Sequence, residues 1–196
     1  HNRLTKVTFK DAQGATTKIV ENQYDAFDRR VGKNVTIPGD TAQYDHERYV
    51  YDGTDMVFAF EGTSSALGVS DLAHRYLWGP AVDQLLADEH VSLTATWNRA
   101  VPYFTETAPL GTMIGENGYW LDGNLYAHPT ARYDCFGNER NYNGDLRFRF
   151  TGQEWDADVG LYYYNARWYD PQTAQFISQD PLGFAAGDPN LYRYVG

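Results

Sequence analysis

The 196-residue sequence lacks several features that would narrow its function at once. It contains a single cysteine, Cys135, so no disulfide can form within the chain and the redox compartment stays undetermined. No stretch approaches the roughly 18 consecutive apolar residues of a membrane-spanning helix, and no basic region followed by an apolar run opens the chain. We therefore expect neither a membrane-spanning segment nor an export signal in these residues.

Basic side chains are also in the minority. The 16 lysines and arginines stand against 26 aspartates and glutamates, which gives a formal net charge of -10. The basic residues are scattered singly or in pairs along the chain. Because binding to phosphate requires clustered lysine and arginine, this distribution argues against a nucleic-acid partner.

The common catalytic and metal-binding motifs are missing as well. The five histidines are isolated, and neither a His-x-His nor a His-Glu-x-x-His spacing occurs. Cys135 has no indicated base, and the chain has no Gly-x-Ser-x-Gly elbow and no glycine-rich phosphate loop. Asp88 is most simply a solvated surface charge. We therefore expect no metal site and no cofactor.

Aromatic residues and turn formers are abundant instead. Aromatic residues make up 16% of the chain, which also contains 18 glycines. Apolar and polar residues alternate over 3–9 and again over 16–20, and Asp11 to Gly14 supply a turn between them. This pattern recurs and predicts an all-β protein made of short antiparallel strands and hairpins.

A Tyr-Asp dipeptide recurs through the chain. It occurs at Tyr24-Asp25, Tyr44-Asp45, Tyr51-Asp52, Tyr133-Asp134 and Tyr169-Asp170. Composition alone predicts roughly one or two such dipeptides, so five indicate an eroded repeat. Tyrosine covers a half-buried sheet, while aspartate accepts hydrogen bonds from the backbone of the turn that follows. We expect each dipeptide to close a strand, and the repeated units to stack into a curved sheet.

The C-terminal stretch from Phe148 to Gly196 combines aromatic strands with three Asp-Pro turns, at Asp170, Asp180 and Asp188. Proline restricts the preceding aspartate to extended conformations, so turn formation is one interpretation of these three residues. The same interpretation applies to Asp134, which belongs to a Tyr-Asp dipeptide. The alternative is that one aspartate belongs to a carboxylate pair that shares a proton and activates water. The spacing in the sequence does not decide between the two.

The segment from Tyr162 to Gly196 resembles the core-associated domain at the C-terminal end of Rhs (rearrangement hotspot), or YD-repeat, proteins. The resemblance is carried by GLYYYNARWYDP at 160–171, FISQDPLGF at 176–184 and GDPNLYRYV at 187–195. Upstream, YDCFGN at 133–138 is similar to the family's YDxFGN turn. Ala174-Gln175 departs from the pattern, since the family usually has Gly-Arg there.

The resemblance implies a division into a YD-repeat segment of a spiralling β-shell, residues 1–147, and a turn-rich core-associated plug, residues 148–196. It implies that shell and plug enclose a C-terminal toxin or effector. In members that cleave themselves, the aspartate matching Asp180 pairs with a second one, which would lie beyond Gly196. Asp180 is therefore the candidate catalytic residue, and Asp134, Asp170 and Asp188 are candidate structural turn residues.

Three functions follow as hypotheses. The first is an encapsulating segment of a secreted or cell-surface polymorphic toxin, whose partners are the effector and the neighbouring YD repeats. The second is an aspartyl autoprotease module that releases the toxin. The third is a binding module whose exposed tyrosines and tryptophans contact glycans or the receptor of another cell. Secretion-system proteins and cell-surface proteins are further candidate partners of the parent protein. Complete burial of Trp155 and Trp168 would count against the third. Because the chain begins and ends within turn-rich sequence, we expect it to be a segment of a longer polypeptide.

Overall fold

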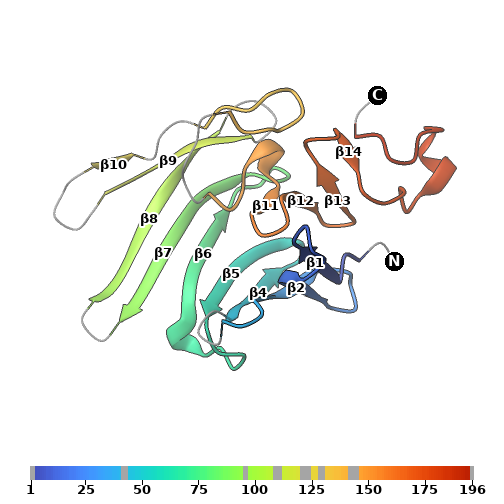
Figure 1. The fold of residues 1–196 in the computed structure, drawn as a ribbon. Helices are drawn as coiled ribbons and strands as arrows, with labels where there is room; N and C mark the ends of the chain where they lie inside the picture. Colours follow the sequence, from blue (N-terminus) through green and yellow to red (C-terminus); the bar gives the residue numbers. More distant parts are fainter. Residues whose placement is uncertain are drawn as a thin grey trace.

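The computed structural model describes residues 3–40, 44–94, 97–107, 112–119, 125–127, 131–140 and 146–194. Ten strands form one antiparallel sheet in which each strand pairs with the next along the chain, so β1 and β10 lie at its two ends. They are β1 (Lys6–Lys10), β2 (Thr16–Tyr24), β3 (Arg30–Thr36), β4 (Tyr44–Asp52), β5 (Asp55–Gly62), β6 (Leu72–Trp78), β7 (Leu85–Thr94), β8 (Trp97–Thr107), β9 (Met113–Tyr119) and β10 (Leu125–Ala127). Figure 1 shows this sheet as curved and open.

A second antiparallel sheet of four strands follows. It consists of β11 (Glu154–Asp156), β12 (Leu161–Tyr164), β13 (Arg167–Asp170) and β14 (Gln175–Phe176). The described residues also form three short 3-10 turns, η1 (Val69–Asp71), η3 (Phe150–Gly152) and η4 (Gly183–Ala186). In the part of the chain that the structure describes, no helix has the length and apolar character needed to cross a membrane.

The expected all-β fold with a curved antiparallel sheet is confirmed. The predicted boundary between residues 147 and 148 falls between the two sheets. Whether they form separate domains stays a prediction.

Alternation along the strands decides which side chains face inward. In β6, His74, Tyr76 and Trp78 lie on one face, while Arg75 and Leu77 between them are exposed. Phe148 packs edge-on against Tyr76 and Trp78, with ring centroids 5.1 and 5.0 Å apart. The segment that leads into the small sheet therefore covers the inner face of the large one, as Figure 1 also shows for β11.

The small sheet has an aromatic core of its own. Tyr162, Tyr169 and Phe176 are buried together, and Tyr164 and Tyr194 pack against them. The Tyr162 hydroxyl donates to the carbonyl of Gly137 at 3.0 Å. Aromatic side chains with one polar end thus fill the core and also fasten it to the neighbouring turn.

Three turns share one hydrogen-bond pattern, which begins at Asp11, Asp25 and Asp134. In each, the aspartate Oδ1 accepts from the backbone N–H groups two and four residues later, at 2.8 to 3.0 Å. The residue three positions on has a positive φ: 86° at Gly14, 65° at Asp28 and 87° at Gly137. The carboxylate replaces backbone partners that the turn lacks, which explains why aspartate occupies this position.

The expectation that every Tyr-Asp dipeptide closes a strand is wrong in one case. Tyr24-Asp25, Tyr51-Asp52, Tyr133-Asp134 and Tyr169-Asp170 lie where strands or bridges end and turns begin. Tyr44-Asp45 instead opens β4, and Asp45 pairs with Val35 of β3. The residues after Asp45 are His46 and Glu47, neither of which is a turn former, so the strand continues.

Candidate functional site at the junction of the two sheets

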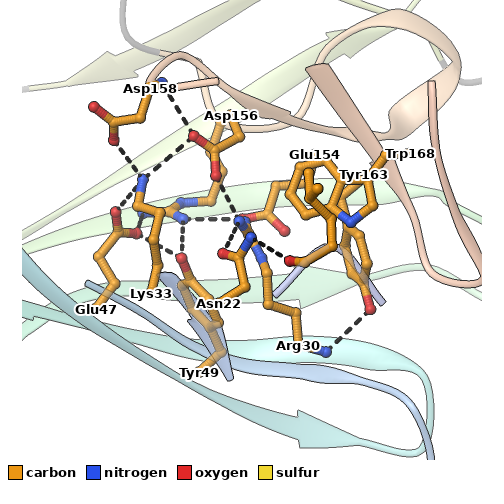
Figure 2. Close-up of polar contacts among 12 residues, drawn as sticks. Asn22, Arg30, Lys33, Glu47, Tyr49, Glu154, Asp156, Asp158, Tyr163 and Trp168 are labelled. Carbon is orange, nitrogen blue, oxygen red and sulfur yellow. Dashed lines mark hydrogen bonds and ion pairs between the residues drawn. The ribbon is translucent and has the colours of Figure 1, made fainter. Parts of the chain in front are cut away.

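Arg30 is the centre of a buried ionic cluster between β3 and β11. Its side chain is only 1% exposed, and its guanidinium meets Glu154 Oε1 at 2.7 Å and Asp156 Oδ2 at 2.5 Å. The aromatic rings of Tyr49, Tyr163 and Trp168 surround it, with their centroids 5.1 to 5.3 Å from the guanidinium carbon. Figure 2 shows these contacts. A cation from the large sheet is thus enclosed by carboxylates and rings that come mainly from the small one.

Lys33 extends the cluster along β3. Its ammonium lies 2.6 Å from Glu47 Oε1, 2.8 Å from Asp158 Oδ2 and 3.6 Å from Asp156 Oδ1. Strict alternation would place residues 30 and 33 on opposite faces of a strand. The register of β2 and β3 shifts between the pairs Tyr24–Arg30 and Gln23–Gly32, which leaves an extra residue in β3. This bulge turns Arg30 and Lys33 to the same face.

Arg147 completes the cluster. Its guanidinium meets Glu47 at 2.7 Å, Glu61 at 2.5 Å and Glu154 at 3.0 Å. Three cations therefore face five carboxylates, which are contributed by β4, β5, β11 and the turn after β11. This ionic cluster consists of Arg30, Lys33, Arg147, Glu47, Glu61, Glu154, Asp156 and Asp158.

The charges in the ionic cluster hold one another in the ionised form. Burial alone raises the pKa of Glu47, but Arg147 and Lys33 outweigh it and bring that pKa well below its usual range. Burial likewise raises the pKa of Asp156, and Arg30 and Lys33 reverse the effect. For Lys33, burial lowers the pKa, and Glu47 and Asp156 raise it above the ordinary value. The arrangement suits a structural role in joining the two sheets, because every buried charge has an opposite charge beside it.

The residues singled out from the sequence lie outside the ionic cluster. Asp180 Oδ1 accepts from the backbone N–H of Leu182 at 2.8 Å, and Asp180 Oδ2 lies 3.1 Å from the Arg167 guanidinium. Among the described residues, the charged group that pairs with Asp180 is therefore a cation.

Asp170 and Asp188 each accept a hydrogen bond at 2.8 Å from the backbone N–H two residues later, at Gln172 and Asn190. Asp134 begins one of the three turns with the shared pattern described above. Turn contacts are thus observed at all three candidate turn residues, and also at Asp180.

The structure also brings together residues that the sequence left apart. Asp88 is buried, with 3% of its surface exposed, so its interpretation as a solvated surface charge is wrong. It lies between His74 and His90, because β6 and β7 pair in a register that sets these two histidines opposite each other. The Asp-x-His spacing in β7 places both side chains on one face of a strand. This spacing is the feature of the sequence from which the proximity of Asp88 and His90 could have been predicted.

A cavity of about 480 Å³ lies beside the ionic cluster. Lys33, Glu47, Glu61 and Arg147 line it together with His74. Trp155 contributes to its wall, whereas Trp168 is buried at 1% exposure.

Comparison with known proteins relates the chain to bacterial toxins, although no family model matches it. Double-stranded DNA deaminase toxin A of Burkholderia cenocepacia is 29% identical over 210 residues, which cover 99% of this chain and 14% of that protein. The tRNA3(Ser)-specific nuclease WapA of Bacillus spizizenii is 27% identical over 98% of this chain and 8% of that protein. Toxin protein Tse5 of Pseudomonas aeruginosa is 50% identical over 52 residues, which are 26% of this chain and 4% of that protein.

Among solved structures, the TcdB2-TccC3 complex shares the fold. It aligns with a TM-score of 0.67 at 18% identity, over 98% of this chain and 10% of that one. The chain thus spans only a small part of each protein that it matches.

Proposed function

This chain belongs to the Rhs, or YD-repeat, proteins, and we propose that it forms part of a β-shell together with the plug that closes it around a C-terminal effector. The proposal places the parent protein among secreted polymorphic toxins. Its partners would then be the effector carried by the same polypeptide and the neighbouring YD repeats. The large sheet is the wall in this proposal, and the segment from Phe148 onward is the plug.

The observation that carries the proposal is the ionic cluster. Arg30 and Lys33 belong to the sheet, while Glu154, Asp156 and Asp158 belong to the segment that lies on it. Removing one partner from a buried ion pair is strongly destabilising, because it leaves an uncompensated charge in the interior. The ionic cluster therefore specifies one position of the plug on the large sheet and opposes its displacement from that position.

Proteolysis of the parent toxin tests this role. In the Arg30→Met variant we expect the effector region to be digested at least tenfold faster than in the unmodified protein, because the plug is no longer held in its seat. Arg75→Gln is the matched control, since Arg75 is half-exposed and pairs with Glu89. If the effector is digested at the same rate in all three proteins, the plug does not protect it.

Self-cleavage is the second candidate function, and Asp180 is the residue that bears on it. The Arg167 guanidinium, 3.1 Å away, fixes the orientation of this carboxylate in the turn. A carboxylate pair would require a second aspartate from outside this chain, as the family resemblance implies. Release of the C-terminal fragment by the Asp180→Asn parent at the normal rate would exclude a catalytic role for Asp180.

The binding-module alternative has less support. Trp168 donates from its indole nitrogen to the Tyr24 hydroxyl at 3.1 Å and is almost fully buried. Its side chain is therefore not presented to a glycan. Trp155 is partly buried against Tyr162.

A further inference from the structure

Three side chains of types that can ligate a metal ion, His74, Asp88 and His90, meet on the inner face of the large sheet. His74 Nδ1 lies 2.8 Å from Asp88 Oδ1, and His90 Nε2 lies 3.4 Å from Asp88 Oδ2. One ligand atom from each residue can be chosen so that all three lie within 4.8 Å of one another. We propose that His74, Asp88 and His90 form a binding site for a first-row divalent cation of the zinc class.

The spacing of the three side chains suits such an ion. Bonds of about 2.0–2.1 Å to a tetrahedral zinc place neighbouring ligand atoms roughly 3.3 Å apart. Asp88 Oδ2 lies 3.1 Å from His74 Nδ1 and 3.4 Å from His90 Nε2, which brackets this value. All three ligand atoms lie within 4.8 Å of one another, so side-chain rotations would bring the two imidazole nitrogens onto one ion. Two imidazoles and one carboxylate also form the three-ligand set of zinc sites that keep a fourth position open.

The position of Asp88 is also suitable. It is buried, and each of its two oxygens faces an imidazole nitrogen of one histidine. His74 lines the cavity of about 480 Å³ beside the ionic cluster, which provides access for the ion.

Neighbouring groups lie close to the two imidazoles. Glu61 Oε1 lies 3.8 Å from His74 Nε2, the ring nitrogen that does not contact Asp88. A carboxylate beside the second nitrogen is the usual partner of a metal-bound histidine, because it fixes the ring orientation. The ring of Tyr103 lies 4.5 Å from that of His90. Glu61 also pairs with Arg147, so the site adjoins the ionic cluster that fastens the plug.

Titration of the metal-free 196-residue chain with Co²⁺ alone tests the proposal. We expect one equivalent to bind saturably and to produce visible absorption bands, and Zn²⁺ to displace it. His90→Gln and Asp88→Asn should each weaken binding at least 100-fold, and Glu61→Gln about tenfold. His46→Gln is the matched control, because His46 lies on β4, outside the His74–Asp88–His90 group, and its Nδ1 contacts Asn34 Oδ1.

Thermal unfolding provides a second readout that does not depend on colour. Zn²⁺ should raise the Tm of the wild type and of His46→Gln in a concentration-dependent way, and should leave His90→Gln unchanged. Circular dichroism would show whether each variant keeps its β-structure. The site does not exist if the wild type binds no Co²⁺, or if His90→Gln and Asp88→Asn bind it as tightly as the wild type.

Discussion

Arg30 shows how a single residue can be decisive without being catalytic. Its guanidinium lies between two carboxylates and is enclosed by three aromatic rings. Its backbone N–H also donates to the Tyr163 hydroxyl at 3.0 Å, so the main chain and the side chain both contact the small sheet. Replacing a residue with so many partners should lower the stability of the protein more than replacing a residue on the surface.

We expect the Arg30→Met variant of the 196-residue chain to lose about 3–5 kcal/mol of unfolding free energy, because Asp156 would be left buried without its closest cation. Lys6→Gln provides the comparison, since Lys6 and Glu21 form a solvent-exposed pair 3.0 Å apart. That change should cost less than about 1 kcal/mol. Urea unfolding measures both, and similar losses in the two variants would contradict the buried role of Arg30.

At the scale of single elements, the three turns with the shared pattern provide an internal comparison. Gly14 and Gly137 occupy the same position and have nearly the same positive φ, 86° and 87°. A Cβ at Gly14 would meet nothing within 4 Å, whereas one at Gly137 would lie 2.6 Å from Phe150 Cδ1. The pair separates backbone strain from crowding.

Gly14→Ala should therefore cost about 1–2 kcal/mol, which is the cost of placing a Cβ in the left-handed region. Gly137→Ala should cost roughly 1–3 kcal/mol more, because Phe150 must also move. Urea unfolding of the two variants measures the difference. Equal losses of unfolding free energy in the two variants would mean that Phe150 moves aside without destabilising the protein.

The sequence predicts the elements better than it predicts their registers. Alternation and Tyr-Asp turns predicted an all-β fold and the ends of β2, β4 and β13, because both are local properties of the chain. The bulge in β3 and the pairing of His74 with His90 depend on how neighbouring strands align, and no local pattern encodes them. For this reason the ionic cluster and the His74–Asp88–His90 group were not predicted, whereas Asp134 and Asp170 were singled out by their turn chemistry.

At the scale of the whole molecule, the two sheets are joined by charges that stay ionised over a wide pH range. The pKa values of Glu47 and Asp156 lie below their ordinary values, and that of Lys33 lies above. A carboxyl group whose pKa is lowered by folding stabilises the protein above its unfolded pKa of about 4 and loses that contribution as pH falls. A raised lysine pKa stabilises the protein below about pH 10.4, and this contribution is lost as pH rises through the folded pKa.

The stability that the ionic cluster contributes should therefore be level between about pH 5 and pH 10 and should decline below about pH 4. Urea unfolding from pH 2 to pH 10 measures this profile. Asp156→Asn removes one of the groups with a lowered pKa, so its stability should be lower at pH 7 and should fall less steeply in acid. The control is Asp11→Asn, because Asp11 lies in an exposed turn outside the cluster. If the wild type grew more stable on acidification, the carboxylates would be taking up protons more readily in the folded protein, and the ionic cluster could not be what joins the sheets.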